Sequence, residues 1–228
     1  MESVEFGSVE ELMGYFSVVG RRVGLRTSVR KGANERTKER ELYCTRQYLT
    51  TLAPNEIIRF PIRLNKGESP DFILSYCECE TWGVEVVEAT TNDYQKYLAN
   101  TEDSKEPDLL FGFDMKKSRG ECGDAIWDGW VGDSPEREAC AAILDAMQKK
   151  AKKIEAGKFS PLSRYDLLIY ENVSAFFYDD SKAMKFLKNV VGQTPCQLAS
   201  LGKVSIITGS RLYYDVTGNM TCFPIFQY

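Results

Sequence analysis

Residues 70–89, PDFILSYCECETWGVEVVEA, contain two strand-like segments separated by a short polar turn. Segments 72–77 and 82–89 are both rich in β-branched and aromatic residues, which favour strands. The letters between them are polar and few, which is typical of a tight connection between neighbouring strands. We therefore expect a β-hairpin here, and the rest of the chain is interpreted outward from it.

On both sides of the hairpin, segments whose apolar residues recur at helical spacing alternate with segments of strand-like pattern. Ser8 opens a capping box before one helix, and Pro135 and Gly157 mark the start and end of another. Pro61 interrupts the strand-like segment 57–64, so this strand is expected at an edge of the sheet. Helices are expected over 9–20, 35–53, from 92 to 99 and 133–157, further strands over 165–170 and 204–208, and a terminal hairpin over 211–216 and 220–226.

This order of elements predicts an α/β fold, with a mixed central β-sheet flanked by helices. Residues 1–34 are expected to form an N-terminal helix and a basic connection, and residues 35–228 a single domain. The polar, acidic segment 101–134 is expected to be a long surface loop. With 228 residues and 43% hydrophobic side chains, the chain has ample material for a buried core.

Two carboxylates of the predicted hairpin are candidates for binding a metal ion. Asp71 opens its first strand and Glu85 lies in the middle of its second, so the two side chains are expected to face one cleft across antiparallel neighbours. Close carboxylates repel each other unless a cation lies between them, and Mg²⁺ or Mn²⁺ prefers such oxygen ligands. We therefore expect Asp71, Glu85 and the carbonyl oxygen of Val86 to bind the metal, while Glu88 points to the opposite face.

A purely structural interpretation of the same residues stays open. In it, Asp71 caps a turn, Glu85 is a satisfied strand carboxylate, and the neighbouring valines fill the core. A run of lysines on the predicted helix 133–157 is interpreted as its solvated end, with contact to a phosphate backbone as the alternative. These lysines are Lys149, Lys150, Lys152, Lys153 and Lys158.

Pro70-Asp71 and Glu85-Val86-Val87 resemble the two motif elements of the PD-(D/E)XK nuclease superfamily, whose fold is restriction-endonuclease-like. The resemblance implies that Asp71 and Glu85 bind Mg²⁺, and that the metal and a lysine activate water for phosphodiester cleavage. It also implies that an acid of the first long helix, Glu39 or Glu41, is an additional ligand in some members. The expected activity is that of a Mg²⁺-dependent endonuclease-like phosphodiesterase, with DNA favoured over RNA.

The chain departs from the superfamily at the motif lysine, where it has Val87. Valine can neither polarise water nor stabilise charge on a phosphate. Members of the superfamily are known to recruit this charge from a following helix. Lys96 is the first candidate for the catalytic role, and Gln95 is the second.

Composition limits the remaining function classes. The chain has no histidine, which excludes serine–histidine and cysteine–histidine hydrolases and histidine-ligated zinc. Seven scattered cysteines and the absence of an N-terminal apolar segment predict reduced thiols and a cytoplasmic location, with no membrane association. Residues 21–66 hold twelve Lys/Arg against four Asp/Glu, and residues 68–138 hold six against eighteen. This asymmetry favours nucleic acid as the partner of the basic stretch, with ordinary solvated surfaces as the alternative.

Two other functions remain open. The first is a module with the same fold that has lost its chemistry and binds nucleic acid or a protein. The second is an unrelated acidic interaction domain in which the motif is coincidental. The oligomeric state is open as well, a dimer included.

Overall fold

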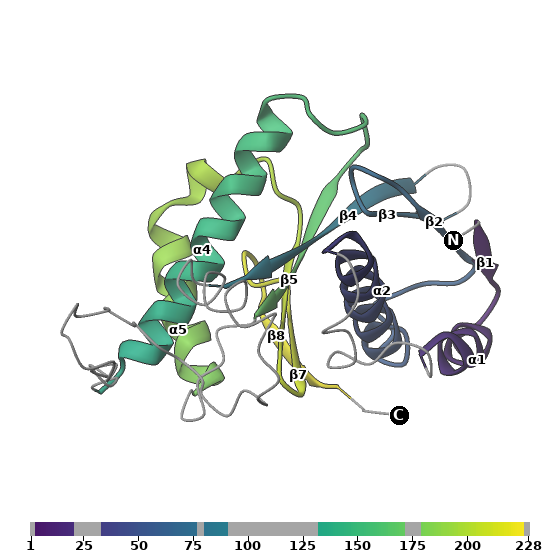
Figure 1. Ribbon diagram of the computed structural model, residues 1–228, viewed down its shortest axis with the longest axis horizontal. Helices are drawn as coiled ribbons and strands as arrows, with labels where there is room; N and C mark the ends of the chain where they lie inside the picture. Colours follow the sequence, from purple (N-terminus) through teal and green to yellow (C-terminus); the bar gives the residue numbers. More distant parts are fainter. Residues whose placement is uncertain (1–2, 21–32, 77–79, 91–131, 172–178, 226–228) are drawn as a thin grey trace, which may run out of the picture.

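The computed structural model describes residues 3–20, 33–76, 80–90, 132–171 and 179–225, and within them the chain forms one mixed β-sheet covered by helices on both faces (Figure 1). Eight strands lie in the sheet in chain order, with antiparallel pairing everywhere except for the parallel β4–β5 and β5–β6 pairs. The strands are β1 (Val4–Phe6), β2 (Ile62–Lys66), β3 (Phe72–Tyr76), β4 (Glu80–Ala89), β5 (Tyr165–Glu171), β6 (Val204–Thr208), β7 (Arg211–Tyr214) and β8 (Thr221–Pro224).

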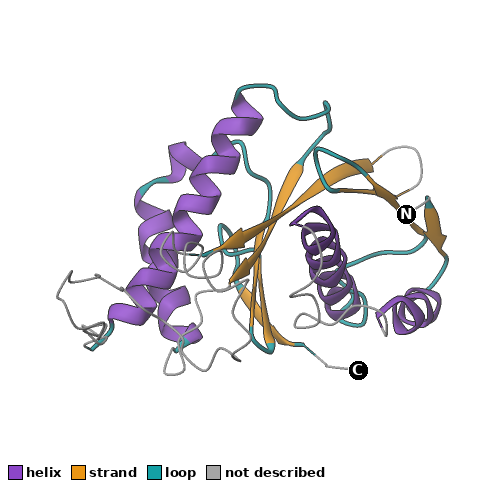
Figure 2. Cartoon of the chain, viewed as in Figure 1, coloured by secondary structure: helices purple, strands orange, loops and turns teal. Residues whose placement is uncertain are grey.

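The helices form two layers, one on each side of the sheet (Figure 2). Helices α1 (Val9–Gly20) and α2 (Ala33–Leu52) cover one face. Helices α4 (Ser134–Glu155) and α5 (Asp180–Gln193), with the short 3₁₀ helix Pro195–Leu198, cover the other. The expected α/β architecture with a mixed sheet is confirmed.

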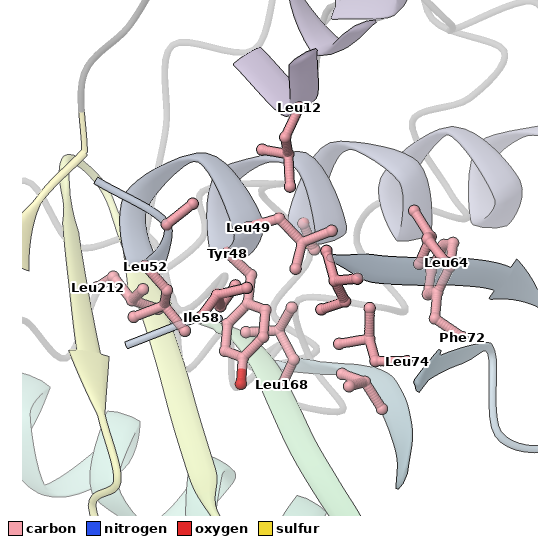
Figure 3. Close-up of a cluster of buried hydrophobic side chains, with 14 of the residues drawn as sticks. Leu12, Tyr48, Leu49, Leu52, Ile58, Leu64, Phe72, Leu74, Leu168 and Leu212 are labelled. Carbon is pink, nitrogen blue, oxygen red and sulfur yellow. The ribbon is translucent and has the colours of Figure 1, made fainter. Parts of the chain in front are cut away.

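Strand β4 lies between the two layers and contributes to both cores. Trp82 and Val84 point toward α2, where they join the apolar cluster shown in Figure 3. Val87 and Ala89 point toward α4. Because successive side chains of a strand face opposite sides, β4 can place functional side chains on either face of the sheet.

Most predicted elements agree with the structure. Helices α1, α2 and α4 and strands β3 to β8 are confirmed, with bounds that differ from the predictions by a few residues. The predicted strand 57–64 is wrong in two respects: β2 begins only after Pro61, and it is not at the edge, because β1 pairs with it. Proline lacks the N–H needed for a ladder hydrogen bond, so the strand starts just beyond it.

Several sequence predictions lie outside the described residues. They are the basic connection for residues 21–32, the helix predicted from 92 to 99, and the predicted surface loop up to residue 131. Among the residues that the structure does describe, no helix is long and apolar enough to cross a lipid bilayer.

Candidate functional site

The β3–β4 hairpin brings Asp71 and Glu85 together. The strands are antiparallel, as predicted, and Phe72 pairs with Val84. The next pair outward in the same register is Asp71 opposite Glu85, so the two carboxyl groups start from adjacent strands.

The backbone at Gly83 allows the chain before β3 to lie close against β4. A Cβ atom added at Gly83 would come within 2.3 Å of Cγ of Pro70, far inside van der Waals contact. Glycine at this position therefore lets Pro70 pack directly on β4. This contact positions Asp71, the next residue, over the middle of β4.

Asp71 is held by the backbone of β4 and by the field of its neighbours. Its Oδ2 accepts a hydrogen bond of 2.7 Å from the Val86 N–H. Burial, and next the negative charge of Glu85, raise the pKa of Asp71 to about 7, with a smaller raising effect from Glu41 of α2. Without a cation, this carboxyl group is thus partly protonated at neutral pH.

Glu85 is buried and paired with a lysine from the helix layer. Its Oε1 accepts a hydrogen bond from Nζ of Lys150 on α4, and only 15% of the Lys150 side chain is exposed. The other carboxylate oxygen, Oε2, is buried without a hydrogen-bond partner in the described part of the chain. Lys150 also lowers the pKa of Asp71, which places its charge within electrostatic reach of both acids.

Lys150 is a site residue that the sequence interpretation missed, because it was grouped with the solvated lysines of the helix end. That interpretation is wrong for Lys150, whereas Lys149 beside it is 67% exposed and pairs with Asp145. The signal was in the helical spacing. Ile143, Met147, Lys150 and Ile154 follow one another at intervals of three and four residues, which puts Lys150 on the stripe that faces the sheet.

On the α2 face, two further acids follow the expected geometry. Glu88 forms an ion pair with Arg40 of α2, which confirms that it points away from the Glu85 face. Glu41 of α2 binds Nζ of Lys66 at 3.3 Å and contributes to the field at Asp71. Glu41 is therefore the helix acid that the structure brings into electrostatic contact with the candidate site.

The structure leaves two sequence candidates without a position. Lys96 and Gln95 lie outside the described residues. Val87, at the motif lysine position, faces the same side as Glu85 and packs against the α4 core. The lysine that reaches Glu85 in the described part of the chain therefore comes from a helix rather than from β4.

The donor set fits one hard divalent cation that keeps several waters. Asp71 and Glu85 supply carboxylate oxygens, including the unpartnered Oε2. The N–H and C=O of one strand residue face the same neighbour, so the Val86 carbonyl oxygen is expected on the Asp71 side, to which its N–H points. Within the described ranges, no three His, Cys, Asp or Glu side chains gather as a metal-binding group. Such a site suits Mg²⁺, which is often held by one or two carboxylates with waters completing its shell.

Comparison of the chain with family models, curated proteins and solved structures gave no match.

Proposed function

We propose that this protein is a Mg²⁺-dependent nuclease of the PD-(D/E)XK type, with a restriction-endonuclease-like fold, that hydrolyses phosphodiester bonds of DNA. The observation that carries the proposal is the Lys150–Glu85 contact beside Asp71. It supplies two acids and one ammonium in a single cluster, although the motif lysine is replaced by Val87. The candidate ligands are Asp71, Glu85 and the Val86 carbonyl, with Mg²⁺ or Mn²⁺ as the ion.

The roles follow from the chemistry of each group. When bound, the divalent cation would lower the pKa of a water molecule and polarise the phosphate. Asp71 and Glu85 would hold the ion, and the Val86 N–H keeps the Asp71 carboxylate in position. Lys150, which is largely buried and paired with Glu85, would stabilise negative charge as it develops on the phosphate.

Cleavage assays on Lys150 variants test this proposal. Lys150→Gln should lower Mg²⁺-dependent cleavage of DNA by about 10²–10³-fold, since it removes a preorganised donor, while calorimetric Mg²⁺ binding persists. Lys149→Gln is the matched control, because it removes the exposed neighbouring charge and should leave cleavage unchanged. Asp71→Ala and Glu85→Ala should abolish both cleavage and Mg²⁺ binding.

The position of the lysine can be tested separately. In the Lys150→Gln background, Val87→Lys should restore part of the activity, because position 87 faces the same side as Glu85. Lys96→Ala should cleave like the parent protein if Lys150 is the acting lysine. If Lys96→Ala loses cleavage while Lys150→Gln stays active, the catalytic lysine is Lys96 instead. Gln95 would then be the next candidate after Lys96.

A catalytically inactive nucleic-acid-binding module is the second candidate function. It is favoured by the partial neutralisation of the acids within the protein, since Lys150 pairs with Glu85 and the pKa of Asp71 is about 7. Such a cluster can persist without a cation. A parent protein that binds DNA or RNA but cleaves neither with Mg²⁺ or Mn²⁺ would support this function over the nuclease.

A further inference from the structure

A cavity of about 220 Å³ lies on the α2 side of the sheet, at the amino ends of the parallel strands. Trp82 is near the start of β4, Arg164 immediately precedes β5, and Lys203 immediately precedes β6. Parallel strands place these ends at one edge, so residues far apart in the chain meet there. The lining residues are Tyr48, Leu52, Ile57, Ile58, Arg59, Leu74, Tyr76, Glu80, Trp82, Arg164, Lys203 and Tyr214.

Aromatic rings form the walls of this cavity. The ring centroids of Tyr76 and Trp82 are 4.8 Å apart, and Tyr48 and Tyr214 complete the aromatic lining. Figure 3 shows the hydroxyl of Tyr48 pointing away from helix α2, beyond the leucine side chains of the cluster. Because Tyr76 and Trp82 pack on each other, a planar ligand ring would lie against this aromatic lining rather than between the two rings.

Cations lie against two of the rings. The Arg164 guanidinium lies 5.0 Å from the centroid of the Trp82 ring, and Nζ of Lys203 lies 4.8 Å from that of Tyr214. Nζ of Lys203 also donates a 2.6 Å hydrogen bond to the Tyr214 hydroxyl. With Arg59 and against Glu80, the lining carries two more positive than negative charges.

A buried acid, Asp166, anchors the Arg164 side chain and the backbone at Lys203. Asp166 is 3% exposed; its Oδ1 pairs with Nε of Arg164 at 2.9 Å and accepts a 2.8 Å hydrogen bond from the Lys203 N–H. The Arg164 guanidinium is therefore preorganised by its ion pair with Asp166, and Nζ of Lys203 by its hydrogen bond to Tyr214. In addition, the Trp82 Nε1–H is buried and has no acceptor among the described residues.

We propose that this cavity binds a nucleoside monophosphate unit, with the base against the aromatic lining and the phosphate at Lys203 and Arg164. A volume of about 220 Å³ exceeds the ~150 Å³ of a cavity that holds benzene, so it accommodates one ring and leaves sugar and phosphate at its mouth. With Asp166 counted beside the lining residues, one positive charge is in excess, which favours a phosphate. Tyrosine hydroxyls and the indole N–H offer partners for the polar edge of a base, which a plain hydrocarbon ring would not need.

The proposed pocket is separate from the Asp71–Glu85 site. Trp82 faces α2, whereas Glu85, three residues later in β4, faces α4. The ligand contacts need no metal ion. The inference therefore stands or falls independently of the proposed nuclease activity.

Calorimetric titration of the full chain with AMP in EDTA tests the pocket. AMP should bind saturably, with adenosine and ribose 5-phosphate each binding at least ten-fold more weakly, because each lacks one half of the recognised unit. Lys203→Gln should weaken AMP binding at least ten-fold, and Trp82→Phe, which keeps a ring but removes the N–H, at least three-fold. Lys150→Gln should leave the AMP affinity within two-fold, since it alters the other face.

A second arm identifies the source of the nucleotide. A single-stranded oligonucleotide with a 5′-phosphate that displaces AMP at lower concentration indicates a strand terminus, and failure to displace it indicates the free nucleotide. Inorganic phosphate binding as tightly as AMP would overturn the proposal, as would equal AMP affinity in folded Lys203→Gln and in the parent. Absence of saturable AMP binding at millimolar concentration would overturn it too.

Discussion

At the scale of single residues, Asp71 is the group whose ionisation most affects the candidate site. Its pKa of about 7 in the folded chain lies above the ~3.9 of an unfolded aspartate. The folded state therefore holds the proton more tightly between these two values, and stability is lost as pH rises from about 4 to 7. Above pH 7 the full cost of two buried carboxylates is present unless a cation offsets it.

Asp71→Asn is expected to stabilise the metal-free protein at pH 8. The amide removes the repulsion from Glu85, and its oxygen can still accept the Val86 N–H, so Tm should rise by a few degrees. At about pH 3, below the pKa of both the folded and the unfolded state, Asp71 is protonated in either state, so the change in Tm should be less than about one degree. Thermal unfolding in EDTA at both pH values measures this.

Addition of Mg²⁺ at pH 8 is the control for that measurement. It should raise the Tm of the parent protein and leave Asp71→Asn nearly unchanged, because the variant has lost a ligand. A variant that is less stable than the parent at pH 8 would show that Asp71 is not repelled by its surroundings.

The acids of the site were predictable from sequence, whereas the lysine was not. Asp71 and Glu85 carry a motif within one hairpin, and the period of two fixes the opposite orientation of Glu88. Lys150 follows Glu85 by 65 residues and reaches it only through the packing of α4 on the sheet. A long-range contact of this kind has no local motif, although the buried stripe of α4 contained a weak signal.

At the scale of elements, the packing of the β3–β4 hairpin requires glycine at position 83, because a side chain there has no room. Gly83→Ala would bring Cβ to within 2.3 Å of Cγ of Pro70 and 3.0 Å of Cδ1 of Leu162. Overpacking of this kind is expected to cost about 1–3 kcal/mol. Because Pro70 directly precedes Asp71, Mg²⁺ affinity and cleavage should fall as well, although Gly83 contacts neither metal nor substrate.

Gly14→Ala is the matched control for the hairpin variant. A Cβ at this position of helix α1 meets nothing within 4 Å, so alanine should stabilise the helix by up to about 1 kcal/mol. Chemical denaturation of both variants, with calorimetric Mg²⁺ titration, makes the comparison. If Gly83→Ala is destabilised but its Mg²⁺ affinity is unchanged, the Gly83–Pro70 contact does not position the metal ligands.

No bounds were predicted from the sequence for helix α5, although Ala183, Leu187 and Val191 form a helical stripe. Two other elements were predicted poorly because they have little local pattern. Strand β1 has only three residues, too few to show alternation. Strand β2 was displaced in the prediction because apolar residues before Pro61 resemble a strand, although Ile58 belongs to the core beside α2 and Ile57 lines the cavity. Helix α4 was predictable because its burial repeats with the helical period, and β5 because its continuous apolar run is typical of a strand covered on both faces.

At the scale of the whole molecule, at least three of the twelve Lys/Arg in residues 21–66 are already engaged in ion pairs. In the described part of this stretch, Arg40, Arg63 and Lys66 pair with acids of the same chain. Phosphate contacts are therefore expected mainly from the other basic residues of the stretch. Fewer basic residues of this stretch are therefore candidates for nucleic-acid binding.

Charge reversal of Arg21, Arg22 and Arg26 to glutamate should weaken binding to DNA and flatten its salt dependence. Each lost phosphate contact reduces the slope of log affinity against log salt by about one, so the triple variant should lose up to about three. Arg63→Gln is the control, because Arg63 already pairs with Glu5. An unchanged slope in the triple variant would return these arginines to an ordinary solvated surface.

The order of the strands also bears on how the protein assembles during synthesis. Each strand pairs with the one before it in the chain, so every new strand finds its partner already made as the ribosome releases it. Glu85 emerges 65 residues before Lys150, an interval of about 3–13 s at about 5–20 residues per second. For that time the nascent hairpin carries two neighbouring acids without the lysine, and ions of the surrounding solution are the cations at hand to screen them.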